Sequence, residues 1–100
     1  MYARYAYKQT ASPEFDPKKN VANIRKHGVS LAAGDGVLND PLALTAEDDT
    51  AESEQRFVTI GMNSFGSLMV VVYTHRDDDI RLISVRKFDP TERRSYEKGI

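Results

Sequence analysis

The sequence predicts an α+β fold, with helical segments near both ends of the chain and an antiparallel sheet between them. Two helix starts support this prediction, because Asp16 and Asp89 are each capping residues followed by a proline at the first helical position. The third observation is the apolar run at 67–74, which follows a turn signal at 63–66 and is typical of a strand covered on both faces. We therefore expect helices packed on a sheet.

The first predicted helix starts after Asp16 and runs to about His27, where Gly28 is a typical C-terminal stop. Val21 and Ile24 are spaced to share one side of this helix, and we expect that side to be buried. The helix would then turn its basic residues toward solvent.

A second, weaker helix is predicted after the capping residue Ser30, over residues 31–38. It is weaker because Gly34 and Gly36 each cost about 1 kcal/mol relative to alanine. From Pro41 onward the pattern changes to a meander of about four strands. Strands are expected at 42–44, 56–62, 67–74 and 80–87, and the acidic run at 47–54 predicts an exposed loop.

The chain has 100 residues, of which 40% are hydrophobic, and this suits one domain with one modest core. We expect residues 14–100 to form that domain and residues 1–13 to be a loosely attached extension. No apolar run is long enough to span a membrane and no leader pattern opens the chain, so we expect a cytoplasmic protein. With no cysteine and two distant histidines, we expect neither a disulfide framework nor a metal site, and no cofactor.

The net charge of −1 conceals a segregation of charge along the chain. Residues 1–30 carry six basic and two acidic groups, residues 31–79 two and ten, and residues 80–100 six and three. If the two basic ends meet in space, they form the positive surface that a nucleic-acid ligand requires. The alternative is that these charges only solvate exposed helices.

The last predicted hairpin gives a geometric expectation. With residues 77–78 as a two-residue turn, Thr74 lies opposite Arg81, and Arg76 then projects from the same face as Arg81. Strict alternation adds Lys87 to this face and points Arg86 to the opposite one, unless a bulge changes the register.

Five segments in this order resemble the BrnT toxin family: 15–19, 23–30, 40–41, 56–61 and 83–87, the last being Ile-Ser-Val-Arg-Lys. The resemblance covers roughly residues 14–97. It implies a RelE-like ribonuclease toxin of a type II toxin–antitoxin pair. Its expected partners are an RNA substrate and a BrnA-type antitoxin, through which two toxins per antitoxin dimer would reach operator DNA.

A ribonuclease of this type, working without a metal, must orient the RNA 2′-hydroxyl toward the adjacent phosphorus and stabilise added negative charge on the phosphate. Arginine suits this task because its guanidinium group stays charged and can donate hydrogen bonds to two phosphate oxygens at once. The candidate catalytic residues are Arg76, Arg81, Arg86 and Lys87. The candidate RNA-binding residues are Lys19, Lys26, Arg93 and Tyr96. For each charged residue the alternative is a surface ion pair worth under about 1 kcal/mol.

The general base stays open on sequence grounds. His75 is a candidate by residue type but is predicted on the face opposite Arg76. Lys87 is an equal candidate, whereas His27 is better explained as a partner of the helix C-terminus. A different class of function is also open, in which the chain is a non-catalytic module that binds an antitoxin and acts as corepressor. Expression of the chain alone distinguishes the two, because only a ribonuclease arrests translation.

Overall fold

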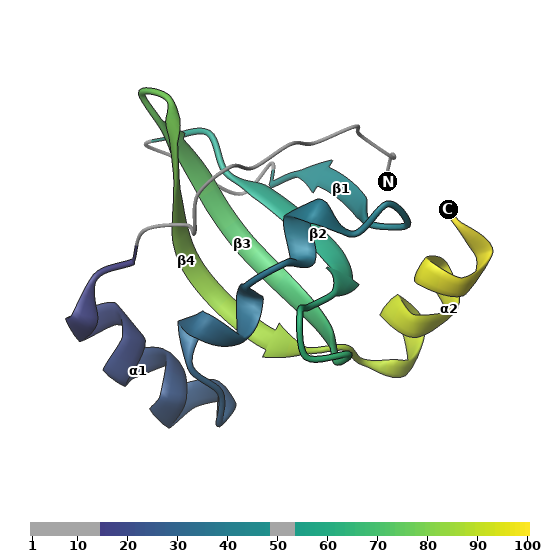
Figure 1. Cartoon of the computed structure of the whole chain (residues 1–100), viewed down its shortest axis with the longest axis horizontal. Helices are drawn as coiled ribbons and strands as arrows, with labels where there is room; N and C mark the ends of the chain where they lie inside the picture. The colour runs from purple at the N-terminus through teal and green to yellow at the C-terminus, as the bar shows by residue number, and fades with distance from the viewer. Residues whose placement is uncertain (1–14, 49–53) are drawn as a thin grey trace.

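The computed structural model describes residues 15–48 and 54–100, and within them a four-stranded antiparallel sheet in the order β1-β2-β3-β4 (Figure 1). The strands are β1 (Leu44–Glu47), β2 (Phe57–Met62), β3 (Leu68–Arg76) and β4 (Asp79–Lys87). The helices are α1 (Pro17–His27), the 3₁₀ helices η1 (Leu31–Gly34) and η2 (Val37–Asn39), and α2 (Pro90–Lys98). The predicted α+β class with a four-stranded meander is confirmed. The expected extension at 1–13 and the middle of the acidic run lie outside the described residues.

Helix α1 has the predicted ends but not the predicted buried side. The Asp16 carboxylate accepts a hydrogen bond from the backbone N–H of Lys18 at 2.8 Å, and Gly28 closes the helix in the left-handed conformation. The expectation that Val21 and Ile24 are buried is wrong, because they are 50% and 46% exposed.

Asn23 is the buried residue of α1, and it explains how the helix packs. Its side-chain amide donates to the carbonyl of Val85 in β4 at 2.8 Å, and its side-chain oxygen accepts from the Val85 N–H at 3.0 Å. Asn23 thus takes the place of a neighbouring strand at that point of the sheet edge, where an unpaired backbone would otherwise be exposed. A polar contact of this kind has no hydrophobic periodicity, so the sequence pattern selected the wrong side.

The predicted second helix is also wrong, since the segment forms η1 and η2 instead of one α-helix. Gly36 is left-handed, with φ of 84°, which interrupts the helix. Gly34 lies so close to the sheet that an added Cβ would be 3.0 Å from a methyl group of Val85. The two glycines therefore let the segment turn and pack tightly against the sheet.

The first strand begins later than predicted, because a turn occupies the start of the predicted segment. The Asp40 carboxylate accepts a hydrogen bond from the N–H of Leu42 at 2.9 Å, and the Leu42 side chain is 52% exposed. This local bond competes with sheet pairing. The strand consequently starts at Leu44.

The sheet is covered on both faces, as the apolar run at 67–74 predicts. Val70 and Val71 point to opposite faces and are 1% and 0% exposed. One face packs against η1 and η2, and the other against α2, whose Tyr96 joins the cluster around Val70. The members of the first cluster are Leu31, Val37, Leu38, Met69, Val71, Tyr73, Ile80, Leu82 and Val85.

The hairpin between β3 and β4 has the predicted turn and pairing, with Arg76 opposite Asp79 and Thr74 opposite Arg81. The register then shifts, because Tyr73 pairs with Leu82 whereas Val72 pairs with Ser84. Residue 83 is the additional residue of a β-bulge.

The bulge corrects the predicted faces of two candidate residues. Arg86 pairs with Val70 and therefore lies on the face of Arg81, while Lys87 pairs with Met69 on the opposite face. Strict alternation had placed Lys87 with Arg81 and Arg86 opposite, and that expectation is wrong.

The register can be checked by disulfide formation, because the chain contains no cysteine. We expect the Val72→Cys/Ser84→Cys pair to oxidise faster than Val72→Cys/Ile83→Cys, since only the first pair is directly opposed across the strands. The measurement is the rate of thiol loss in a glutathione redox buffer. Faster oxidation of the second pair would mean that the bulge is absent.

Candidate functional site

Three arginines share one face of the sheet, and we call this the arginine face: Arg76, Arg81 and Arg86. Arg81 lies opposite Thr74, two residues from Arg76, so the two arginines are diagonal neighbours about 7–8 Å apart. Their guanidinium groups can therefore reach one anion. Arg86 lies opposite Val70, four residues from Thr74 along β3 and so about 13 Å farther along the sheet at a rise of about 3.3 Å per residue. The arginine face thus offers one position for a phosphate group between Arg76 and Arg81, with Arg86 as a third cation farther along the strand.

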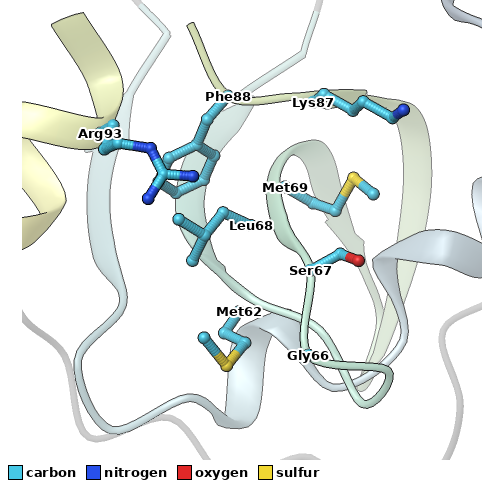
Figure 2. Close-up of a pocket in the computed structure, with 8 residues that line it drawn as sticks. All are labelled: Met62, Gly66, Ser67, Leu68, Met69, Lys87, Phe88 and Arg93. Atoms are coloured by element: carbon cyan, nitrogen blue, oxygen red, sulfur yellow. The ribbon is translucent and has the colours of Figure 1, made fainter. Parts of the chain in front are cut away.

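Two further candidate cations, Lys87 and Arg93, line a hollow of about 390 Å³ at the end of the sheet, which we call the end hollow. Figure 2 shows Arg93 and Lys87 on opposite sides of the hollow, with Leu68 between them. The lining residues are Met62, Gly66, Ser67, Leu68, Met69, Lys87, Phe88 and Arg93. The end hollow therefore combines an apolar lining with two positive side chains, and the predicted cations fall into two groups rather than one.

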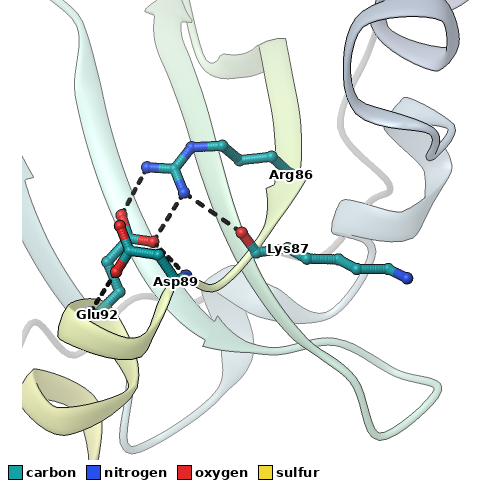
Figure 3. A network of polar contacts seen from close by, with 4 residues as sticks. All are labelled: Arg86, Lys87, Asp89 and Glu92. Carbon is teal, nitrogen blue, oxygen red and sulfur yellow. Dashed lines mark hydrogen bonds and ion pairs between the residues drawn. The ribbon is translucent and has the colours of Figure 1, made fainter.

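Arg86 is fixed by Glu92 from the first turn of α2 (Figure 3). Its two terminal nitrogens donate to the two carboxylate oxygens of Glu92 at 2.7 and 2.6 Å. Glu92 Oε1 also accepts from the backbone N–H of Asp89 at 2.9 Å, and Asp89 Oδ1 accepts from the Glu92 N–H at 2.7 Å. The capping box of α2 and the ion pair therefore share one carboxylate, which joins the helix start to β4.

Tyr96 holds the other end of α2. Its hydroxyl donates to Asp40 Oδ2 at 2.6 Å, and its ring packs edge-on against Phe88 with centroids 5.6 Å apart. Asp40 Oδ2 also accepts from the backbone N–H of Met62 at 2.8 Å. Tyr96, an RNA-contact candidate on sequence grounds, is thus half-buried and attaches α2 to the loop that precedes β1.

The remaining candidates lie away from the arginine face. Lys19 and Lys26 are exposed on α1, the helix that packs along β4. His75 lies on the sheet face opposite Arg76, as alternation predicts, and its ring is edge-on to Phe57 at a centroid distance of 5.4 Å. His27 is the last residue of α1. His75 therefore does not adjoin the arginine face.

Within residues 15–48 and 54–100, the structure has no group of three or more histidine, aspartate or glutamate side chains positioned to hold a metal ion. The same part of the chain contains no helix with the length and apolar character that crossing a membrane requires.

A small α+β domain with three arginines on one sheet face is suited to binding polyanions such as nucleic acids. The chain belongs to the BrnT family: residues 15–92 match the family described as "Ribonuclease toxin, BrnT, of type II toxin-antitoxin system". The family implies a ribonuclease toxin with an antitoxin protein as its partner. No curated protein matches the sequence. The matched segment contains the whole arginine face and ends at Glu92, the residue that fixes Arg86.

Loss of the Glu92 charge is expected to destabilise the fold. Glu92→Gln leaves Arg86 without its charged partner, and we expect a loss of about 1–2 kcal/mol, because Glu92 is 9% exposed while the Arg86 side chain keeps partial access to water. The measurement is urea unfolding. The control is Glu97→Gln, an exposed position on the same helix. Equal stability of the two variants would show that the ion pair contributes nothing measurable.

Proposed function

We propose that this protein is a RelE-like endoribonuclease that cleaves RNA without a metal ion and thereby arrests translation in the cytoplasm. In the proposed reaction, the 2′-oxygen forms a bond to the adjacent phosphorus as the bond to the 5′-oxygen of the next nucleotide breaks, which leaves a 2′,3′-cyclic phosphate and a 5′-hydroxyl. Water takes the proton of the 2′-hydroxyl and supplies the proton of the leaving 5′-oxygen. The observation that carries the proposal is the arginine face, which lies within the segment that matches the ribonuclease toxin family.

Arg76 and Arg81 are the proposed phosphate clamp. Attack by the 2′-hydroxyl adds negative charge to the non-bridging phosphate oxygens, and two guanidinium groups on one face can donate to both oxygens as this charge develops. Two donors on diagonal positions also restrict the orientation of the phosphate, which favours in-line attack. The clamp therefore acts on both the charge and the geometry of the transition state.

The two candidates for a general base, His75 and Lys87, both lie on the sheet face opposite Arg76 and Arg81. The proposal accordingly assigns the main part of the rate enhancement to orientation and charge stabilisation rather than to a base beside the clamp. Lys87 lies at the end of β4 and lines the end hollow, too far from Arg76 and Arg81 to exchange a proton at the clamp, so its proposed contribution is to RNA binding.

The other cations are proposed to bind the RNA backbone. Arg86 is fixed by Glu92 and would contact a phosphate one or more nucleotides away from the clamp. Arg93 would act from the end hollow, and Lys19 and Lys26 from α1, mainly through sequence-independent attraction. Tyr96 would support these contacts by holding α2 in place.

The proposed inhibitor is a BrnA-type antitoxin, with two toxins assembled on one antitoxin dimer and operator DNA bound only through that complex. Family membership supports an antitoxin partner. The arginine face and the two basic ends of the chain would attract an acidic segment of such a partner as well as RNA.

The clamp is tested by replacing arginine with lysine. Arg81→Lys keeps the charge that drives RNA binding but loses the pair of hydrogen bonds that one guanidinium group donates to the phosphate. We therefore expect similar RNA affinity and at least about tenfold slower single-turnover cleavage. The measurement uses one RNA at matched salt, with the melting temperature of each protein recorded.

The matched control is Arg56→Lys, which replaces an arginine before β2 whose described ion-pair partner is Glu54 at 3.9 Å. We expect this variant to cleave at the rate of the unmodified protein. Equal rates for Arg81→Lys and the unmodified protein would remove Arg81 from the catalytic site.

A further inference from the structure

The end hollow is bordered by two cations, Lys87 and Arg93, for which the described part of the chain provides no acidic partner. Lys87 and Arg93 are both exposed, and across residues 15–48 and 54–100 the structure gives neither side chain an ion pair. The residues that line the hollow include no carboxylate. Every other residue of the lining is uncharged, so the hollow favours an anionic ligand.

Large apolar side chains are exposed at the same end of the sheet. Met62 lines the hollow and is 41% exposed, and Phe65, which precedes the lining residue Gly66, is 77% exposed. An exposed aromatic next in sequence to a hollow that carries cations can bind single-stranded nucleic acid, because a base stacks on the ring while the cations contact the backbone.

The turn that carries Phe65 is held in one conformation. The side-chain oxygen of Asn63 accepts hydrogen bonds from the backbone N–H groups of Phe65 and Ser67, both at 2.9 Å. Its amide donates to the carbonyl of Ala33 at 2.8 Å, and Asn63 itself is 7% exposed. Phe65 is thus presented on a preorganised turn, which lowers the entropy cost of binding.

The end hollow continues from the arginine face. The lining residue Leu68 lies on the arginine face, two residues from Val70, which pairs with Arg86, whereas Lys87 reaches the hollow from the opposite face. A strand whose phosphates contact Arg81 and Arg86 in turn would reach the end hollow with its next nucleotides. Lys87 and Arg93 lie on opposite sides of the hollow (Figure 2). In this arrangement each cation can contact one of the two phosphates that flank a nucleotide bound in the hollow.

We propose that the end hollow is a subsite for one unstacked nucleotide of the RNA strand. The base packs against Met62 and Phe65, and the flanking phosphates contact Lys87 and Arg93. This inference rests on the proposed function, because it assigns a position to part of the same RNA substrate. Continuity with the arginine face favours RNA over a protein segment as the occupant.

The test compares two probes of equal length and charge: a single-stranded oligodeoxynucleotide and its abasic analogue. Neither has the 2′-hydroxyl needed for the proposed cleavage, so fluorescence anisotropy reports binding alone. We expect the unmodified protein to bind the base-bearing probe at least about fivefold more tightly, which corresponds to the lower limit of base–aromatic stacking.

Two double variants separate the base contact from the phosphate contact. Met62→Ala/Phe65→Ala is expected to remove the preference for bases, and its control is Val21→Ala/Ile24→Ala, an exposed apolar pair on α1. Lys87→Gln/Arg93→Gln is expected to weaken both probes and to reduce the salt dependence by about one unit of slope per cation. The control for charge is Lys98→Gln at the end of α2.

The subsite is contradicted if the unmodified protein binds both probes equally, or if Met62→Ala/Phe65→Ala keeps the preference for bases. It is also contradicted if these variants bind the probes normally but escape inhibition by an antitoxin, because the hollow would then belong to the protein partner. The proposed function fails separately, if the protein prefers base-bearing probes yet does not cleave the corresponding RNA.

Discussion

One additional residue in β4 determines which cations can act together. The bulge at residue 83 lets Val72 pair with Ser84, and from that point every side chain of β4 changes face relative to strict alternation. Arg86 consequently joins Arg76 and Arg81, and Lys87 turns to the end hollow. Without the bulge, Arg86 would point toward the face that packs against η1 and η2, where a charged side chain would be costly to bury.

The ion pair between Arg86 and Glu92 connects this register to the position of α2. Glu92 caps the helix and neutralises Arg86 with the same carboxylate, so the helix start and the end of β4 form one unit. Arg93, the next residue of α2, is thereby fixed beside Phe88 at the end hollow. A pair that is only partly exposed contributes modestly to stability, and its main effect is to fix geometry.

The parts of the fold that depend on local chemistry could be predicted from the sequence. The caps at Asp16 and Asp89 and the two-residue turn before Asp79 need only neighbouring residues, and the structure has all three. The buried side of α1 could not be predicted, because Asn23 is placed by hydrogen bonds to Val85, 62 residues away. Phe65, which precedes the lining residue Gly66, lay in the predicted turn at 63–66, but its exposure depends on the folded structure and could not be predicted from the sequence.

The candidate site divides in the same way, into residues whose placement depends on neighbouring residues and residues whose placement depends on distant contacts. Arg76 and Arg81 were paired correctly, because the turn alone sets their register. The predicted sheet faces of Arg86 and Lys87 were exchanged. The bulge residue Ile83 is an ordinary strand residue and gives no local sign of an irregularity. The partner of Arg86 was also missed. The contact of Glu92 with Arg86 depends on where α2 packs.

The central claim is that the arginine face contacts the RNA backbone. It is tested most directly by following the Nε–H signals of the arginines by NMR during titration with an uncleavable oligodeoxynucleotide, with assignments from single Arg→Lys variants. The account predicts that the signals of Arg76, Arg81 and Arg86 shift at low probe concentration, while that of Arg56, which pairs with Glu54, shifts little. Shifts of Arg25 on α1 with the arginine face unchanged would contradict it.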